Sequence, residues 1–471
     1  MQEPARIAID LGAESCRVSL LRWPDGRPSV ELVHRIPNGP VHQGRQMHWP
    51  LDTILAGLEE GLRKAATIAA EGVASIAVDS WSVDYVRLAP NGKALRAPFC
   101  YRDERTEPVK QAVDKIIAPR ALFARTGVLP NRINTVCQLI ADTASHIDPR
   151  APWVMMPEYV LYWLGGRRVA ERTNATHTGL VNLKTGDWDA ELFKLLDLPV
   201  DAAPPIVLAG AILGKVAGPL AELDAFRETV LVAPATHDTA SAIAGIPSAL
   251  DSTLYICSGT WSLVGTLIKQ PVVNDEAFDA RYTNLGAAGG DLCFHSVVNG
   301  MWLLKQCMDS WAAEGRPWEI EELIAQAAVS GFPGTIDVDA EPLLLDGEMP
   351  ERINHQLWRR RWATIPDVAG NEPVFARVIF ESLADRYATA LTSLEKLLGR
   401  KLERIHILGG ASRNKLLTNL TEQRTGRPVE TGHPESSTLG NFAVQLAATE
   451  AAGAPVTTEG IRRWAAALSN C

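Results

Sequence analysis

Residues 6–23 read RIAIDLGAESCRVSLLRW, and residues 254–268 read LYICSGTWSLVGTLI. Each stretch predicts an apolar strand, then a turn of small and hydroxyl-bearing residues (12–15 and 258–260), then a second strand. The same opening pattern therefore occurs once in each half of the chain. A pattern that returns only after so long an interval indicates two domains built alike rather than a solenoid of short repeats.

Further strands and helices alternate around these two stretches. Strands separated by helices are typical of an α/β protein rather than a sandwich or a helical bundle. A break at Gly245-Ile246-Pro247 predicts a boundary between domains 1–245 and 246–471. Strands are expected at 73–78, 84–88, 229–233 and 404–408, helices at 51–70, 108–146, 239–245, 300–315 and 374–398, and loops with short strands at 174–187.

Length and charge limit the class of protein. The 471 residues are too many for one hydrophobic core, at roughly 100–200 residues per domain. Because 46 Lys and Arg face 55 Asp and Glu, the net charge is −9, which argues against nucleic acid or an anionic membrane as partner. No apolar leader opens the chain, and no apolar run reaches the roughly 18 residues of a membrane helix. We expect a cytoplasmic monomer or homodimer that acts on a small molecule.

Several familiar motifs are missing from the sequence. It contains no G-x-x-x-x-G-K-[ST] loop, no G-x-G-x-x-G after a strand, no H-E-x-x-H and no G-x-S-x-G. Its 7 cysteines are scattered and form no C-x-x-C pair, so neither a disulfide framework nor a cysteine zinc site is expected. These absences argue against P-loop kinases, dinucleotide enzymes, zinc proteases and α/β-hydrolases.

The two small-residue turns can bind an anion. Backbone N–H groups converge on an anion at such turns, and Ser15 or Thr260 can donate further hydrogen bonds. Asp10 ends the first strand, where a Mg²⁺ ion would neutralise phosphate groups. Each turn taken alone is equally consistent with an ordinary hairpin turn. Two such turns facing each other would hold a polyphosphate from both sides.

Two further turns lie at strand ends. Asp238, in Thr236-His237-Asp238-Thr239, either caps the following helix or presents a carboxylate where open α/β sheets bind ligands. Gly409-Gly410 is either a tight turn or a flat platform for a nucleobase, because only glycine lets a ligand approach the backbone without a Cβ clash.

The order of these motifs resembles the FGGY family of carbohydrate kinases, which has the actin/Hsp70/hexokinase-type fold. That fold consists of two ribonuclease-H-like α/β domains with an interdomain cleft. The resemblance covers residues from about 6 to 450. The stretches that carry it are DLGAES (10–15), VDSWSVD (78–84), CYRDERT (100–106), NAT (174–176), THDTAS (236–241), SGTWSL (258–263), LGGASRN (408–414) and SSTLGN (436–441).

The resemblance implies transfer of the γ-phosphate of ATP to a sugar hydroxyl, with ATP and Mg²⁺ as cofactors. It makes Asp238 the catalytic base and associates Asp10 and Asp238 with the metal. The residues expected at the sugar are Trp81, Ser82, Asp84, Arg102, Asp103, His237, Asp238, Thr239 and Asn299. Those expected at ATP are Ala13, Glu14, Ser15, Cys16, Arg17, Thr260, Lys305, Gly409 and Gly410.

The expected substrate is a ketose, foremost L-rhamnulose at O1. L-Fuculose, L-xylulose or another pentulose are alternatives within the family. An ATP-gated binding module of the actin or Hsp70 type is the alternative of another class, but polar groups suited to a polyol, such as His237 and Asp238, argue against it.

Four positions differ from the members of the family that act on L-rhamnulose. Those usually have Gly at the positions of Cys16 and Ser82, Asn at the position of Val297 and Gln at the position of Lys305. Asn299 is close to the expected Asn but out of register. A sugar wall with Val297 instead of Asn would favour a methyl group, as in a 6-deoxy ketose.

Overall fold

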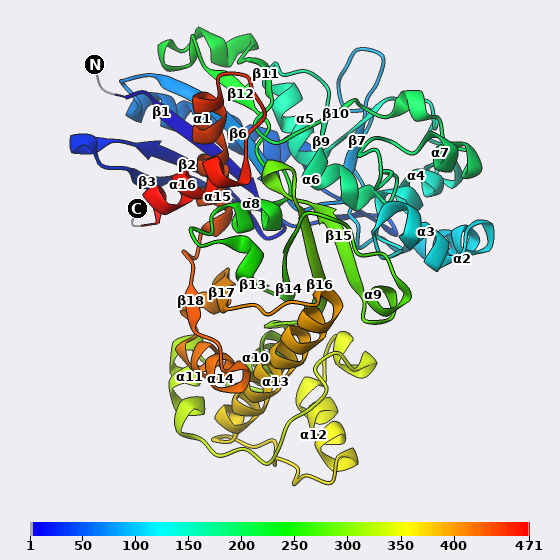
Figure 1. Cartoon of the computed structure of the whole chain (residues 1–471), viewed down its shortest axis with the longest axis vertical. Helices are drawn as coiled ribbons and strands as arrows, with labels where there is room; N and C mark the ends of the chain where they lie inside the picture. Colours follow the sequence, from blue (N-terminus) through cyan, green and yellow to red (C-terminus); the bar gives the residue numbers. More distant parts are fainter. Residues whose placement is uncertain (1–2, 470) are drawn as a thin grey trace.

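The computed structural model describes residues 3–469 and 471, and its two main sheets each have six strands (Figure 1). The first sheet has the order β11-β12-β6-β1-β2-β3, and the second has the order β15-β16-β14-β13-β17-β18. The first consists of β1 (Ala5–Leu11), β2 (Ser15–Arg22), β3 (Ser29–Pro37), β6 (Val73–Ser80), β11 (Ile212–Lys215) and β12 (Val230–Val232). The second consists of β13 (Thr253–Ser258), β14 (Trp261–Ile268), β15 (Tyr282–Gly286), β16 (Leu292–Asn299), β17 (Arg404–Leu408) and β18 (Val429–Thr431).

Five strands of each sheet share one topology, and the sixth strand, β11 or β15, lies at opposite edges of the shared set. In the first, β3, β2 and β1 are antiparallel neighbours, and β6 and β12 follow β1 in parallel. In the second, β16, β14 and β13 are antiparallel neighbours, and β17 and β18 follow β13 in parallel. The predicted duplication is confirmed, and each half has the ribonuclease-H-like arrangement that the resemblance implies.

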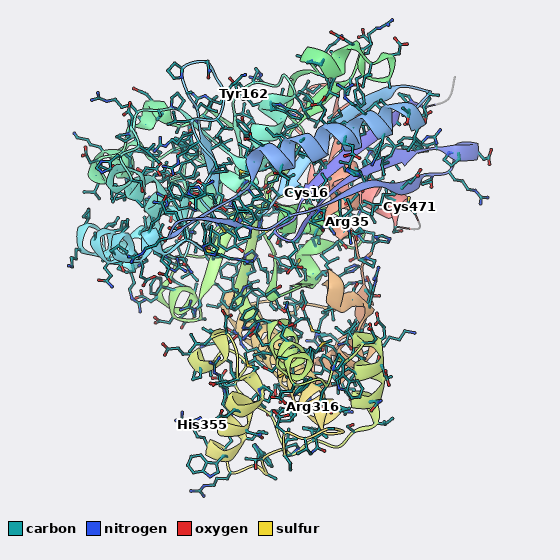
Figure 2. The ribbon with its side chains drawn as sticks, turned by 180° about the vertical axis from the view of Figure 1, so that it is seen from behind. Cys16, Arg35, Tyr162, Arg316, His355 and Cys471 are labelled. Atoms are coloured by element: carbon teal, nitrogen blue, oxygen red, sulfur yellow. The ribbon has the colours of Figure 1, made fainter. Side chains whose placement is uncertain are left out.

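Helices cover both sheets. Figure 2 shows the molecule from behind, with Cys16 in the upper body and Arg316 and His355 in the lower body. The first half holds α1 (Leu51–Ile68), α2 (Glu107–Ile116), α3 (Pro119–Thr126), α4 (Thr135–Ala144), α5 (Met156–Trp163), α6 (Arg172–Ala175), α7 (Ala190–Leu195) and α8 (Asp238–Ala244). The second holds α9 (Asp275–Asp279), α10 (Trp302–Ala313), α11 (Ile320–Val329), α12 (Met349–Arg359), α13 (Glu372–Leu398), α14 (Lys415–Thr425), α15 (Ser436–Ala451) and α16 (Thr458–Leu468). Among the described residues, no helix is both long enough and apolar enough to span a membrane.

Two sequence-based expectations need adjustment. The helical stretch expected at 108–146 is three helices, because Pro119 starts α3 and Gly127, with φ 74°, ends it. The loops expected within 174–187 are confirmed, but in place of short strands the chain forms the end of α6, a 3₁₀ turn, Thr176–Thr178, and one isolated β-bridge between Val181 and Trp188. The side chain of Glu171 accepts a hydrogen bond from Thr173 N and so starts a helix where the sequence suggested extended chain. Small strand pairs complete the first half: β4 (Val41–Gln43) with β5 (Gln46–His48), β7 (Tyr85–Arg87) with β8 (Trp153–Met155), and β9 (Ala170–Glu171) with β10 (Ile206–Val207).

Helix α15 belongs to the second half by sequence but packs on the first sheet. In Figure 1 the red helices α15 and α16 lie beside the blue strands β1–β3. The α15 side chains form a ladder of hydrogen bonds: Asn441 Nδ2 donates to Asp79 Oδ2 (2.6 Å) and Gln445 Nε2 to Ile7 O (3.0 Å). Buried apolar residues of α15, including Phe442, share a cluster with Ala8 and Ala77 of the first sheet. The division at 245/246 remains a prediction, and α15 joins the two halves.

Gly440 is where α15 crosses α8. A Cβ at this position would lie 1.7 Å from Ser241 O, which no backbone can tolerate without moving. We expect Gly440→Ala to destabilise the protein by at least about 2 kcal/mol, despite the better helix propensity of alanine, because the two helices must separate. Thermal unfolding measures the loss. Gly331→Ala is the control, since nothing lies within 4 Å of a Cβ there, and equal melting temperatures for the two variants would contradict the prediction.

Candidate active site

The first small-residue turn connects β1 to β2. Gly12 N donates to Ser15 O (3.1 Å), and a Cβ on residue 12 would lie 2.6 Å from that oxygen, so glycine is required. Asn38 holds the turn from β3, since its Nδ2 donates to Gly12 O (2.8 Å) and its N to Glu14 O (2.9 Å). Ala13 and Ser15 are partly exposed and Glu14 is exposed, whereas Cys16 is buried. The turn is therefore held by hydrogen bonds and open to solvent at Ala13, Glu14 and Ser15, whereas the side chain of Cys16, which was also expected at ATP, is not accessible.

The second turn connects β13 to β14, and the start of α10 supports it. Met301 N donates to Gly259 O (3.0 Å) and Trp302 N to Thr260 O (3.2 Å). The Gly409 turn lies against the same segment: with φ 78°, a Cβ there would lie 2.8 Å from Ser258 O. The structure thus brings Thr260 and Gly409 together, and the space around a Cβ at Gly410 is open.

Carboxylates gather where the two halves meet. Asp10 on β1 and Asp79 on β6 are register partners and both are buried. Asp10 Oδ2 accepts from Arg17 Nη2 (3.0 Å) and from Ser437 Oγ (2.6 Å), so it binds one residue from each half. Burial, and then the charge of Asp10, raise the pKa of Asp79 well above its usual range. Asp79 was not expected as a site residue, although it lies in the VDSWSVD stretch.

Asp238 is the first residue of α8, and the residue at the N-cap position, His237, makes no side-chain cap hydrogen bond. Its Oδ1 accepts from Thr239 N (2.5 Å) and Thr239 Oγ1 (3.2 Å), and His237 Nε2 lies 3.3 Å away. Among the described residues, no hydrogen bond reaches Oδ2, and 38% of the side chain is exposed. Burial by the protein on its other sides raises the pKa of Asp238 to about 6, although Thr239 opposes this. One carboxylate oxygen is held and the other is free.

Asp84 receives four donors and is almost fully buried. Its Oδ2 accepts from Trp49 Nε1 (2.6 Å), Trp81 Nε1 (3.0 Å) and Tyr101 N (3.2 Å), and its Oδ1 from Gln138 Nε2 (2.9 Å). Burial raises its pKa to about 6. Asp84 therefore orients the rings of Trp49 and Trp81, whose centroids are 4.2 Å apart. A direct contact of Asp84 with sugar stays a prediction.

The turn that presents Ser82 is strained. Val83 has φ 72°, a conformation that β-branched residues rarely adopt. Its carbonyl oxygen is held by Thr135 Oγ1 (2.7 Å) and Gln138 Nε2 (3.2 Å), which keep the backbone in place. Strain maintained by surrounding hydrogen bonds is typical of positions that present a functional group. Ser82 itself is partly exposed.

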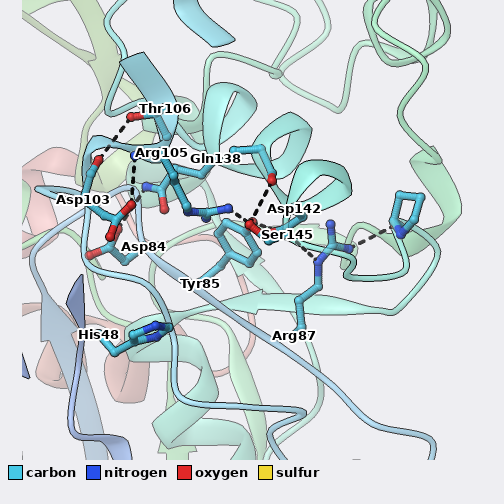
Figure 3. A network of polar contacts seen from close by, with 12 residues as sticks. His48, Asp84, Tyr85, Arg87, Asp103, Arg105, Thr106, Gln138, Asp142 and Ser145 are labelled. Carbon is cyan, nitrogen blue, oxygen red and sulfur yellow. Dashed lines mark hydrogen bonds and ion pairs between the residues drawn. The ribbon is translucent and has the colours of Figure 1, made fainter. Parts of the chain in front are cut away.

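The Arg102-Asp103 segment has a mainly structural setting. Asp103 is buried, and its two oxygens accept from Met47 N (2.7 Å) and Arg105 N (2.9 Å). Figure 3 shows the network behind it, in which Asp142 binds Tyr85, Arg87 and Arg105. Arg102 is exposed and donates to Tyr101 OH (3.2 Å). Of these two expected sugar residues, only Arg102 has a side chain open to a ligand.

Asn299 and Lys305 are placed differently from Val297. Asn299 is buried, and its Nδ2 donates to Val338 O (3.2 Å) and Leu343 O (3.3 Å) while its Oδ1 accepts from Gly300 N (3.0 Å). Lys305 pairs with Asp309 on the exposed face of α10. Val297 is 52% exposed. The structure thus turns Asn299 inward, and sugar binding by Asn299 and ATP binding by Lys305 stay predictions.

Val297 lies in a row of apolar side chains across the second sheet. The strand register places Val297 opposite Leu263 on β14, and Leu263 opposite Cys257 on β13, so the three share one face. Burial, then the charge of Cys293 and that of Asp238, raise the pKa of the Cys257 thiol well above its usual range. Cys257 also packs against the buried cluster that contains Ile243 of α8, so this face of the second sheet faces the helix that begins at Asp238.

Two buried glutamates support the Thr236–Asp238 segment from behind. Glu171 Oε2 accepts from Thr236 N (3.0 Å) and Thr173 N (3.0 Å), and Glu158 Oε1 accepts from Thr236 Oγ1 (2.7 Å). Burial raises the pKa of each carboxyl to about 7. Burial also lowers the pKa of His237 to about 3, so this ring is neutral. The sequence alone suggested no role for either glutamate, because only the fold brings them to this strand end.

The raised pKa of Glu158 makes stability depend on pH. The folded protein holds this proton to about pH 7, while the unfolded chain loses it near 4.5, so stability is lost as the pH rises through that range. We expect Glu158→Gln, which stays neutral and keeps the acceptor oxygen, to gain on the order of 3 kcal/mol over the unmodified protein between about pH 5 and pH 8. Urea unfolding at both pH values measures this. The prediction would be contradicted if the free energies of unfolding of the variant and the unmodified protein differed by the same amount at both pH values.

Comparisons with known proteins extend over nearly the whole chain. The model described as "FGGY family of carbohydrate kinases, N-terminal domain" matches residues 5–245, and that of the C-terminal domain matches residues 254–449. The chain is 31% identical over 447 residues to a rhamnulokinase of Bacillus subtilis, covering 94% of this chain and 90% of that protein. It is 32% identical over 454 residues to a rhamnulokinase of Bacteroides thetaiotaomicron, covering 95% and 92%.

Solved structures match the fold. A gluconate kinase from Lactobacillus acidophilus superimposes with a TM-score of 0.78 at 16% identity, covering 98% of this chain and 92% of that one. A glycerol kinase from Plasmodium falciparum with ADP gives a TM-score of 0.75 at 13% identity, with coverage of 98% and 92%. At these identities the likeness establishes the fold alone.

Proposed function

Because the chain belongs to the FGGY family of carbohydrate kinases, we propose that it phosphorylates O1 of L-rhamnulose with ATP and Mg²⁺. The family defines the reaction class, which is ATP-dependent phosphorylation of a sugar. Relatives of nearly the same length that are named rhamnulokinase support L-rhamnulose as the sugar. L-Fuculose or a pentulose is the alternative.

The observation that carries the mechanism is the asymmetric setting of Asp238. Thr239 holds Oδ1 through two hydrogen bonds, which fixes the plane of the carboxylate. Oδ2 is left to accept the proton of the sugar hydroxyl and to direct its oxygen at the γ-phosphate. Phosphoryl transfer needs little covalent work from the protein, so positioning of this kind accounts for much of the catalysis.

The two turns would hold ATP from opposite halves. Residues 13–17 and Thr260 are the proposed phosphate contacts, and Gly409 and Gly410 the adenosine contacts. Asp10 and Asp238 are the proposed metal carboxylates, and the nearby Asp79 Oδ1 is buried and has no hydrogen-bond partner among residues 3–469 and 471. Oxygen donors of this kind suit Mg²⁺, which when bound neutralises phosphate charge. Among the described residues, no three His, Cys, Asp or Glu side chains form a group that could hold a metal ion, so water and phosphate oxygens would have to complete the shell.

The sugar would lie between Asp238 and the first half's Trp81-Ser82 turn. His237, Thr239 and Arg102 are the proposed polar contacts. On the opposite side, Val297, Leu263 and Cys257 present apolar groups, which suit the methyl group of a 6-deoxy ketose. Asn299 makes its hydrogen bonds within the second half, so it does not offset the loss of an amide at position 297.

A screen of sugars for release of ADP tests the proposal. At saturating MgATP we expect kcat/KM to be higher for L-rhamnulose or L-fuculose than for xylulose or ribulose, with only a modest ratio between the two deoxy sugars. An apolar wall changes kcat/KM only about 10–200-fold between two sugars that differ by one methyl group. A clear preference for glycerol or for a pentulose would overturn the substrate and leave the kinase reaction standing.

A further inference from the structure

His177 lies beside His237 where the two halves meet. It belongs to the 3₁₀ turn Thr176–Thr178, and its ring centroid is 4.0 Å from that of His237. His177 Nε2 lies 3.1 Å from His237 Nδ1. The turn is held in place, since Asn134 Nδ2 donates to His177 O (3.1 Å) and Thr178 Oγ1 donates to Ala175 O (2.6 Å).

The second ring nitrogen of His237 identifies its tautomer. His237 Nε2 lies 3.3 Å from Asp238 Oδ1, and an ionised carboxylate only accepts hydrogen bonds. A bare Nε2 would set its lone pair against that negative charge, so the hydrogen of His237 belongs on Nε2. The ring is buried, which disfavours its charged form, and a neutral imidazole carries one hydrogen. His237 Nδ1 is therefore an acceptor.

The hydrogen between the two rings must then come from His177. Among the described residues, no other hydrogen bond reaches Nδ1 of His237. The third histidine in this region, His295, binds Tyr255 OH through its Nδ1 (3.0 Å). The backbone N of His237 donates to Thr173 Oγ1 (3.2 Å), which anchors the residue but leaves its ring free to turn. In the part of the chain that the structure describes, His177 therefore supplies the one side-chain hydrogen bond that orients this ring.

We propose that His177 is a positioning residue for the phosphoryl transfer: its Nε2–H donates to His237 Nδ1 and so keeps Nε2–H of His237 turned toward Asp238. This rests on the proposed role of Asp238. The hydrogen bond from His177 to His237 Nδ1 and the 3.3 Å approach of His237 Nε2 to Asp238 Oδ1 form a directed series, in which the second link is an electrostatic approach rather than a hydrogen bond. Oδ2 stays available to the sugar hydroxyl. Without the donor, the His237 ring can rotate or change tautomer, and Asp238 loses one of its supports.

Two substitutions separate this role from simple packing. His177→Phe keeps a ring but removes the donor, whereas His177→Gln places an amide N–H near the position of Nε2. We expect His177→Phe to lower kcat/KM for the sugar about tenfold, as for loss of one hydrogen bond, with the KM for ATP unchanged. His177→Gln should stay within about threefold of the unmodified enzyme. His48→Phe is the control, since it removes another buried imidazole, bonded to Ala97 O, away from the Asp238 carboxylate.

The tautomer is measured directly by NMR of protein labelled with ¹⁵N-histidine, with the His237 signals assigned through His237→Gln. In the unmodified protein and in His177→Gln, we expect a hydrogen on Nε2 of His237 and none on Nδ1. In His177→Phe, we expect a mixture of the two tautomers of His237. A hydrogen on Nδ1 of His237 in the unmodified protein would overturn the proposal. The proposal would also be overturned if His177→Gln lowered kcat/KM for the sugar as much as His177→Phe does. The spectrum does not depend on turnover, so it separates this inference from a failure of Asp238 as the base.

Discussion

Replacement of Asp238 by Asn is expected to lower kcat at least about a hundredfold, with ATP binding nearly unchanged. A general base typically raises the rate about 10²–10⁴-fold. The amide of Asn can neither accept the proton of the sugar hydroxyl nor place a negatively charged oxygen next to that hydroxyl. Because Thr239 donates to Oδ1, the amide oxygen can occupy that position and keep the local structure. The variant should therefore fold and bind nucleotide.

Steady-state kinetics at saturating sugar and MgATP, together with calorimetric titration of nucleotide, measure this effect. Asp224→Asn is the matched control, because Asp224 is an exposed carboxylate that pairs only with Arg227 among the described residues and belongs to no proposed contact. It should leave kcat unchanged. An Asp238→Asn enzyme that retains most of its kcat would remove Asp238 from the mechanism.

The second large effect concerns Val297. Family members that act on L-rhamnulose usually have Asn at this position, but in this chain Val297 lies beside the apolar Leu263 and Cys257. We therefore expect Val297→Asn to lower kcat/KM for L-rhamnulose by about tenfold or more, and to lower it less for a ketose without the methyl group. A polar amide in an apolar wall loses the methyl contact and leaves its own hydrogen-bonding groups without partners when the deoxy sugar binds. The row formed by Val297, Leu263 and Cys257 would then be interrupted at its most exposed position.

The measurement is the ratio of kcat/KM for L-rhamnulose to that for L-xylulose. Val329→Asn makes the same change on α11, at a valine that is 88% exposed, and should leave the ratio unaltered. Val297→Ala removes the apolar contact without adding an amide. Its ratio of kcat/KM values should therefore lie between those of the unmodified enzyme and Val297→Asn. If Val297→Asn keeps the original ratio, Val297 does not contact the sugar.

Much of the fold could be predicted because its signals are local. β14 and β17 have the predicted bounds, Trp261–Ile268 and Arg404–Leu408. Each is an apolar run bounded by turn residues, and such residues mark where a strand begins and ends. The strand-turn-strand pattern at 6–23 and 254–268 led to the duplicated topology. Asp238 and Gly409 were singled out because each follows a predicted strand, on the side of the sheet where open α/β sheets bind ligands.

Other features depend on contacts between distant segments. Nothing near residue 440 in the sequence shows that α15 crosses α8 there, or that Asn441 binds Asp79. Asn299 looked suited to a sugar, but residues 338 and 343 take up its amide. The sequence by itself therefore determined the two-fold repeated α/β pattern, the family and the strand-end motifs, because spacing and turn chemistry act over a few residues. Only the tertiary structure decided which side chains meet, as with His177 and His237, because that depends on how elements distant in sequence pack against one another.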